Sequence, residues 1–348
     1  MKISNTREAG VQTAFFARPT WHTWARSARL KVAFGVLSCC AVVPAIAQTY
    51  PNQPISLIIP FTVGGPTDAA ARILGEYLAP KLGQPFVPEN RAGASGVIGG
   101  SIVAKAVPNG YTLFFGSSIL ATRAIMPGPA MPFDLLKDFE IIGKIARSDA
   151  IVTVPSALNI SDLRSLVNLM RTQPDKTQFG SAGIGTQGHL AGELMKYSTK
   201  TTATHVPYKG ESAALLDLLG NRMTFLMCTP MSCAPRIQDG TLKGLAVTAK
   251  VRSKIAPDVP TVAEAGVPDL IAGPWWFLAA PKGTPRAVLD KLSTALNQVL
   301  SDDTFKKRLL ALGLETESST SSAAVRAELQ SDMERWSPII KAANITAD

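Results

Sequence analysis

Short apolar runs alternate with longer amphipathic stretches along most of the chain. Ile55–Ile59 is such a run, bounded by Pro60, and it predicts a buried strand. From Asp68 to Leu82 apolar side chains recur at helical spacing, with Thr67 placed to cap the start of a helix and Gly83 to end it. Alternation of this kind is typical of βαβ units, so we expect largely parallel sheets.

The alternation continues to the C-terminus. Further strands are expected at Phe86-Val87, Tyr111–Phe115, Phe139–Ile145, Ala150–Val154, Thr177–Gly180, Thr204–Val206, Met223–Met227, Leu245–Thr248 and Trp275–Ala280. Helices are expected at Ser161–Thr172, Gly188–Tyr197, Ser212–Leu219 and from Pro285 onward, and a glycine-rich turn at Arg91–Gly100 leads into a helix that ends near Val107. So many strands favour two sheets. We predict two α/β domains, residues 48–148 with 273–348, and residues 149–272.

The first 47 residues have the three parts of a secretory signal. Six basic side chains and one acidic side chain precede an apolar run, Val32–Ala47, which ends in Ala45-Ile46-Ala47. That run is shorter than the roughly 20 residues that cross a bilayer. We therefore predict a signal peptide, residues 1–47, cleaved after Ala47, and a periplasmic mature chain. A lipoprotein anchor at Cys39 is the alternative, because Val36–Cys39 partly fits a lipobox.

Removing the signal changes the composition. The chain carries +9 overall and residues 1–47 carry +5, so the mature part has 29 basic against 25 acidic side chains, or +4. This is an ordinary soluble surface, and we expect no nucleic-acid partner. The remaining histidines, His189 and His205, make no ligand cluster, so no metal is expected. Cys228 and Cys233 form either a small disulfide loop, which the periplasm permits, or two free thiols.

Three loops share one design, in which a strand ends, small polar residues follow, and a helix begins. They are Phe61–Asp68, Gly116–Ser118 and Ser181–His189. In open α/β sheets ligands lie beyond the carboxyl ends of the strands, where helix N-termini offer free N–H groups to anions. These loops therefore predict a carboxylate site, although the glycines could serve only tight turns. The residues expected to bind are Phe61, Thr62, Gly64, Gly65, Thr67, Asp68, Ser117, Ser118, Gly185, Thr186 and Gln187.

One of these loops also matches a dinucleotide motif. Gly183–Gly188 reads G-x-G-x-x-G between a predicted strand and a predicted helix. Binding of a dinucleotide needs an acidic residue at the end of the next strand, about 20 residues on, and Thr202–Lys209 contains none. We therefore expect no nucleotide cofactor, nor any other.

Enzyme motifs are equally sparse, with no G-x-S-x-G, no S-x-x-K beside K-T-G and no Walker A sequence. The enzyme class kept as an alternative is an exported serine hydrolase, with Ser117 or Ser118 as nucleophile and His189 as base. Two further candidates are open. Trp276, in the aromatic run that starts at Trp275, either packs in the core or lines a cleft. Arg123 either pairs with a second carboxylate of a ligand or is solvated.

At these same residues the chain resembles the Bug family, the substrate-binding receptors of tripartite tricarboxylate transporters. Matching segments run in order through the mature chain. They include Tyr50-Pro51, Gly64–Asp68, Glu89-Asn90-Arg91, Gly110–Leu113, Leu136–Phe139, Gly183–Leu190, Val206–Gly210, Leu245–Thr248, Asp258–Gly266 and Ala280–Pro285.

The resemblance implies a type II periplasmic-binding-protein fold, in which two α/β domains close on a ligand between them. It implies that the first loop, the Ser117-Ser118 loop and the Gly185-Thr186 loop hold the ligand carboxylate. It also implies integral membrane permease subunits as partners of the liganded receptor.

Two positions depart from the family pattern. Family members commonly carry an aspartate that can bind an amino group at the binding-site position where this chain has Cys228. The absence of that aspartate counts against an amino-acid ligand. Phe277 stands where many members have glycine, which suggests a bulkier, more apolar cleft and an aromatic or longer carboxylate. We expect a monomeric, non-catalytic receptor for a di-, tri- or aromatic carboxylate. A sensor that signals to a histidine kinase through the same pocket is the other alternative.

Overall fold

The computed structural model describes residues 50–317 and 321–347, so the predicted signal peptide lies outside the described residues. Eleven strands occur in this part of the chain. They are β1 Ile55–Ile59, β2 Phe86–Asn90, β3 Thr112–Ser117, β4 Phe139–Arg147, β5 Ile151–Pro155, β6 Gln178–Ser181, β7 Thr204–Pro207, β8 Phe225–Cys228, β9 Leu242–Val247, β10 Trp275–Pro281 and β11 Glu315–Thr316.

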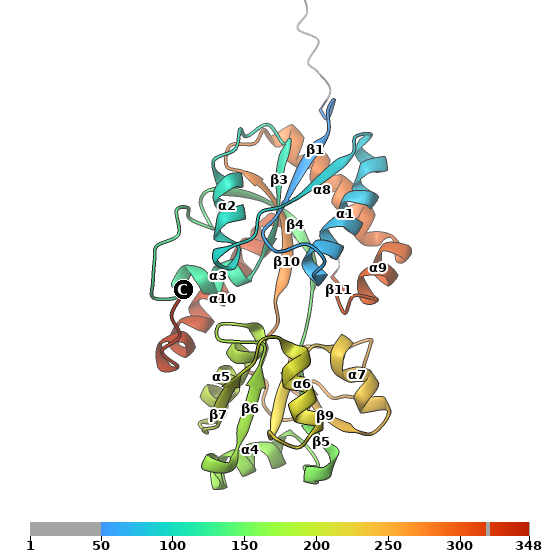
Figure 1. Cartoon of the computed structure of the whole chain (residues 1–348). Helices are drawn as coiled ribbons and strands as arrows, with labels where there is room; N and C mark the ends of the chain where they lie inside the picture. The colour runs from blue at the N-terminus through green and yellow to red at the C-terminus, as the bar shows by residue number, and fades with distance from the viewer. Residues whose placement is uncertain (1–49, 318–320, 348) are drawn as a thin grey trace, which may run out of the picture. The chain divides into compact units, whose positions relative to one another are not determined.

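The helices alternate with these strands, as Figure 1 shows. They are α1 Pro66–Leu82, α2 Val97–Ala104, α3 Ile119–Ile125, α4 Leu163–Thr172, α5 Gln187–Thr199, α6 Glu211–Leu219, α7 Pro230–Gln238, α8 Arg286–Ser301, α9 Asp303–Leu310 and α10 Ser322–Ala342. Short 3-10 turns are η1 Ala94–Gly96, η2 Ser156–Leu158 and η3 Pro174–Lys176. Among the described residues, no helix is both long enough and apolar enough to cross a membrane.

The strands form two sheets, as expected, but the sheets are mixed. One sheet has the order β11-β4-β10-β3-β1-β2 and the other β7-β6-β8-β5-β9. Strands β2, β1 and β3 are parallel, and so are β7, β6 and β8, whereas β10 is antiparallel to β3 and β4, and β5 to β8 and β9. The expectation of largely parallel sheets is therefore wrong at β5 and β10, and at the two-residue strand β11, which is antiparallel to β4. Strands β5 and β10 are the first strands after the chain passes from one sheet to the other, and each runs against its neighbours.

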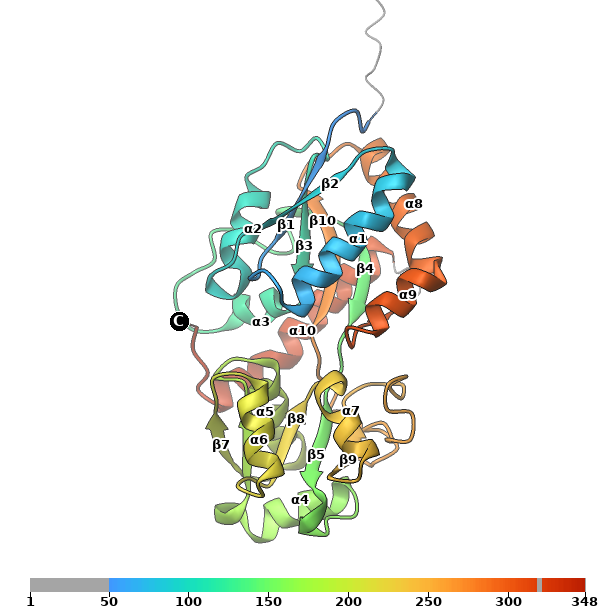
Figure 2. The same ribbon diagram turned by 45° about the vertical axis from the view of Figure 1, so that its right-hand side comes forward.

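This topology determines where the loops lie. Strand β4 ends at the segment that crosses to the second sheet, and β3 and β1 point the same way as β4. Strand β5 starts from that crossing, so β6, β8 and β9, which oppose it, point back toward the crossing. The carboxyl ends of the parallel strands in both sheets thus face the two crossing segments. Figure 2 shows the loops after β1, β3 and β8 on this side of their sheets.

Most local predictions are confirmed, but helices α3 and α7 were not predicted and several details differ. Thr67 is not the N-cap of α1, because Pro66 already occupies the first helical turn and Gly65 precedes it. Gly116 and Ser117 are the last residues of β3 rather than a loop. The expected turn at 91–100 is helical from Val97, and Gly100 serves packing there, since a Cβ would lie 2.5 Å from the Phe133 ring.

Helix α10 belongs to two cores. Val325 and Leu329 pack with β-strand residues of the first sheet such as Phe114. Trp336, two turns further on, is buried together with Phe179 of the second sheet. The domain ranges 48–148 with 273–348 and 149–272 stay a prediction, and α10 does not follow them.

Candidate functional site

The loop after β1 is shaped by Asp68. This side chain is 3% exposed, and its carboxylate accepts hydrogen bonds from the Gly64 N–H at 3.0 Å, from Arg72 Nε at 2.9 Å and from Asn90 Nδ2 at 2.9 Å. Burial alone would raise the pKa of Asp68, but these hydrogen bonds outweigh burial and hold the pKa below its usual range. Asp68 therefore orders the loop, while Thr62 and Gly64 of the same loop are exposed.

The aromatic side chains of β10 pack inside the protein. Trp276 is 5% exposed and lies in the core of the first sheet, where its Nε1 donates to Thr67 Oγ1 at 3.1 Å. Phe277 is fully buried, and a Cβ on Gly116 would lie 2.3 Å from its ring, so Gly116 provides the space that this ring fills. The expectation that Phe277 lines the cleft is wrong, because its side chain is buried in the core that contains Phe114.

The loop after β3 is tied to the same strand. Ser118 Oγ accepts from the Trp275 N–H at 3.1 Å, and Ser117 Oγ accepts from the Ile119 N–H at 3.3 Å. Ser117 is fully buried and Ser118 is 6% exposed. Arg123 donates to the backbone oxygen of Pro129 at 2.7 Å and is 5% exposed, so it is neither solvated nor held free for a ligand.

The loop after β6 is folded on itself. Thr186 Oγ1 donates to the Gly183 oxygen at 2.7 Å, and the Gly185 N–H donates to His189 Nδ1 at 3.0 Å. Two of the expected donors are therefore already engaged within the loop. Gln187, the first residue of α5, differs, because its Nε2 is buried and has no hydrogen-bond partner.

The cysteines of the second sheet form a disulfide. Cys228 at the end of β8 is bonded to Cys233 in α7, and both are fully buried. The expected place of Cys228 in a ligand site is therefore occupied by a disulfide inside the core. The adjoining Thr229 donates through its N–H and its hydroxyl to Glu211 Oε1, at 3.1 and 2.9 Å.

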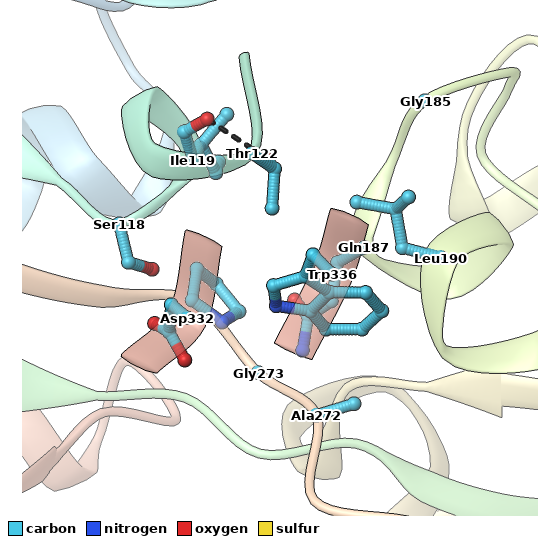
Figure 3. A pocket seen from close by; sticks show the side chains of 11 residues that line it. Ser118, Ile119, Thr122, Gly185, Gln187, Leu190, Ala272, Gly273, Asp332 and Trp336 are labelled. Atoms are coloured by element: carbon cyan, nitrogen blue, oxygen red, sulfur yellow. Dashed lines mark hydrogen bonds between the residues drawn. The ribbon is translucent and has the colours of Figure 1, made fainter. Parts of the chain in front are cut away.

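A pocket joins residues of both sheets, and Figure 3 shows its walls. Its cavity volume is about 40 Å³, and it is partly open to solvent. Three residues expected at the site lie in its wall, namely Ser118, Gly185 and Gln187. The other lining residues are Ile119, Thr122, Leu190, Ala272, Gly273, Pro274, Asp332 and Trp336. Phe61–Asp68, Ser117, Thr186, Cys228 and Trp276 are outside this wall.

Among the lining residues that the sequence did not reveal are Asp332 and Trp336 of α10. Asp332 accepts from Trp275 Nε1 at 2.9 Å and from Arg335 Nη2 at 2.7 Å, and it is 8% exposed. Trp336 lies across the pocket from Ser118 in Figure 3. Their spacing of four residues places both on one helix face, and this is the signal the sequence carried.

The two crossing segments meet at Thr248. Its Oγ1 accepts from the Ala150 N–H at 2.9 Å and donates to the Ala272 oxygen at 2.5 Å. The Ser148 N–H donates to the Pro274 oxygen at 2.9 Å, and a Cβ on Gly273 would lie only 2.1 Å from the Ser148 oxygen. The two crossing segments are thus held side by side, and Ala272–Pro274 of the second segment line the pocket.

Comparison with known proteins identifies the fold and the family. The sequence pattern of one family, described as tripartite tricarboxylate transporter family receptor, matches residues 70–345. The chain belongs to this family. It is 32% identical to protein BugT of Bordetella pertussis over 318 residues, which cover 90% of this chain and 97% of BugT. The family resemblance inferred from the sequence is therefore confirmed.

Solved structures of similar proteins have the same fold. A protein of Rhodopseudomonas palustris, solved with adipate, is 32% identical and superposes with a TM-score of 0.70 over 85% of this chain and 99% of that one. MatC from Rhodopseudomonas palustris, with bound malate, is 28% identical with a TM-score of 0.67 over 84% of this chain and 100% of MatC. The expected periplasmic-binding-protein fold is confirmed, and this chain is a solute-binding protein of the family.

Proposed function

We propose that this protein captures a small organic carboxylate in the periplasm and delivers it, as a monomer, to integral membrane permease subunits. The observation that carries the proposal is the pocket whose wall includes Ser118, from the loop after β3, and Gln187, from the start of α5. Gln187 Nε2 is a buried donor without a partner, and a buried donor costs about 1–3 kcal/mol unless a ligand or water accepts from it. A carboxylate oxygen is a suitable acceptor.

The surroundings favour an anion further. Gln187 is the first residue of α5, a helix of 13 residues, and it lines the pocket. The first N–H groups of such a helix have no hydrogen-bond partner within the helix. A helix N-terminus carries a partial positive charge, which stabilises a carboxylate. The N-terminus of α1, reached from Phe61–Asp68, lies at the carboxyl end of β1 and is proposed as the second anchoring element on closure.

The ligand class follows from the relatives as well as the pocket. Adipate and malate, in the two related structures, are both dicarboxylates. We propose a di- or tricarboxylate, or an aromatic carboxylate that stacks on Trp336. Binding in the cleft would stabilise the closed arrangement of the two sheets, because the ligand contacts both only in that arrangement.

The test is a thermal-shift screen of the purified protein with C4–C6 di- and tricarboxylates, aromatic carboxylates and amino acids, with nucleotides as controls. A ligand at a hundred times its Kd adds about 2.7 kcal/mol of stability. We expect one carboxylate class to raise the melting temperature, and calorimetry to show one-to-one binding without turnover. A response to nucleotides alone, or hydrolysis of esters that is lost in Ser118→Ala, would contradict the proposal.

Delivery requires a second experiment. Uptake of the bound carboxylate should need both this protein and the permease subunits, and binding without any effect on uptake would favour the sensor alternative.

A further inference from the structure

Two histidines are stacked beneath the loop that follows β6. The rings of His189 and His205 lie 3.9 Å apart at an angle of 15°, and the Phe179 ring stacks on His205 at 4.9 Å. His189 is 6% exposed. Apart from His22 in the predicted signal, these are the histidines of the whole chain.

Both rings are hydrogen-bonded to this loop. His189 Nδ1 accepts the Gly185 N–H at 3.0 Å, and His205 Nε2 lies 2.7 Å from Ser181 Oγ. Ser181 Oγ in turn donates to the Gly183 oxygen at 2.9 Å. The loop is therefore attached to the histidine pair at both of its ends.

The hydrogen bond from Gly185 defines the state of His189. A ring nitrogen that accepts a hydrogen bond carries no proton, so His189 is neutral with its proton on Nε2. Nε2 lies 3.8 Å from Glu193 Oε1, which Lys196 also binds at 2.8 Å. Burial, and after it the charge of Lys196, lowers the pKa of His189 to about 4. Strands β6, β7 and β8 bring no other charged side chain against the pair.

We propose that His189 is a positioning residue for the binding site. By accepting a hydrogen bond from the Gly185 N–H, His189 holds the loop in the conformation that leaves the start of α5 open to a carboxylate. This inference rests on the proposed function. Because the acceptor is lost when Nδ1 gains a proton, the loop should loosen on acidification, and affinity for the ligand should fall for a reason other than ionisation of the ligand.

The first test needs no ligand. Nitrogen-15 NMR of the purified protein should show His189 as the Nε2–H tautomer at pH 7, and the Gly185 amide signal should shift as His189 titrates between pH 7 and 3, around its pKa of about 4. An Nδ1–H tautomer, or a Gly185 amide that does not change over this range, would overturn the proposal.

The second test compares two substitutions. His189→Asn keeps an uncharged acceptor near the position of Nδ1, whereas His189→Phe keeps the stacked ring and removes the acceptor. At pH 7 we expect the Asn variant to bind adipate, malate or the best acid from the screen within about twofold of wild type, and the Phe variant about tenfold more weakly.

Affinities measured from pH 7 to 4 complete the test. The ratio of wild-type to His189→Asn affinity removes the ionisation of the ligand, which is the same for both proteins. This ratio should fall as the pH falls, and a constant ratio would contradict the proposal, as would wild-type affinity in His189→Phe. If the wild type binds no carboxylate, the proposed function fails, and the tautomer and the Gly185 shift still decide whether His189 holds the loop.

Discussion

Glu315 on β11 accepts a hydrogen bond from the backbone N–H of Lys254, 2.9 Å away, and so joins the first sheet to the segment that leaves the second. Its Oε1 also accepts from Ser253 Oγ at 3.1 Å, and the side chain is 8% exposed. This contact lies at a different cavity from the pocket of Figure 3, one lined by Arg147 and Asp149. Glu315 therefore stabilises the arrangement of the two sheets seen here.

Glu315→Ala should destabilise the protein by about 1–3 kcal/mol, because it leaves the buried Ser253 hydroxyl and the Lys254 N–H without their acceptor. Glu315→Gln keeps an acceptor and should cost less. Urea denaturation measures both. The control is Glu76→Ala, which removes an exposed ion pair with Arg308 and should change stability by at most about 1 kcal/mol. Equal effects of Glu315→Ala and Glu76→Ala would contradict this account.

Asp149 should give stability an unusual pH dependence. Burial, and the nearby carboxylates of Glu315 and Glu317, raise its pKa from 3.8 to about 6, despite the opposing effect of Arg147. Between about pH 4 and 6 the native state thus holds a proton that the unfolded state has released, so the contribution of Asp149 to stability falls as the pH rises through this window. The stability of Asp149→Asn relative to wild type should therefore rise from pH 4 to 6 and stay level above. A difference independent of pH would refute the assignment.

The disulfide should have a moderate effect on stability. It closes a loop of only four intervening residues, for which loop entropy alone gives about 2 kcal/mol. We expect the double variant Cys228→Ala, Cys233→Ala to lose about this much in urea denaturation and to be insensitive to dithiothreitol, whereas wild type with dithiothreitol should approach the variant. Unchanged stability in both would show that the bond does not form in solution.

Gly273 should not accept a side chain. A Cβ at this position would lie 2.1 Å from the Ser148 oxygen, so Gly273→Ala must push the two crossing segments apart and should cost about 1–3 kcal/mol. Gly65→Ala is the matched control, since a Cβ there lies 3.8 Å from the nearest atom and Gly65 has a φ of −80°. If the two variants are equally stable, the crossing is looser than described.

Gln187→Glu should weaken carboxylate binding more than Gln187→Leu. Leucine removes the free donor, at a cost of about tenfold in Kd, and glutamate adds a negative charge in the pocket wall beside the anion. Isothermal titration of the acid found in the screen measures both. Affinities that do not differ from wild type would place the carboxylate elsewhere in the cleft.

The sequence predicted those features that depend on local pattern. Ile55–Ile59 is apolar except at Ser56 because the strand is covered on both sides, and Gly83 ends α1 because it adopts a left-handed conformation with φ 74°. Three loops with small polar residues indicated the side of the sheets on which the pocket of Figure 3 lies. Ser118 and Gln187 could be named for that reason.

What the pattern could not predict depends on contacts between distant segments. Whether β10 runs parallel or antiparallel leaves its apolar composition unchanged, so the mixed sheets were missed. Asp332 and Trp336 form one face of an amphipathic helix, and nothing in that spacing distinguishes a pocket wall from a core. The free state of Gln187 Nε2, and the capture of the Gly185 N–H by His189, likewise follow only from the fold around them.

Helix α10 has a further consequence, for how the protein unfolds. The first turns of α10 are part of the core that contains Phe114, and Trp336 is part of the core that contains Phe179. If one sheet came apart, the helix would lose half of its packing and the other core would lose a buried aromatic side chain. The two halves should therefore melt in a single cooperative transition rather than in two steps, even though each has its own sheet.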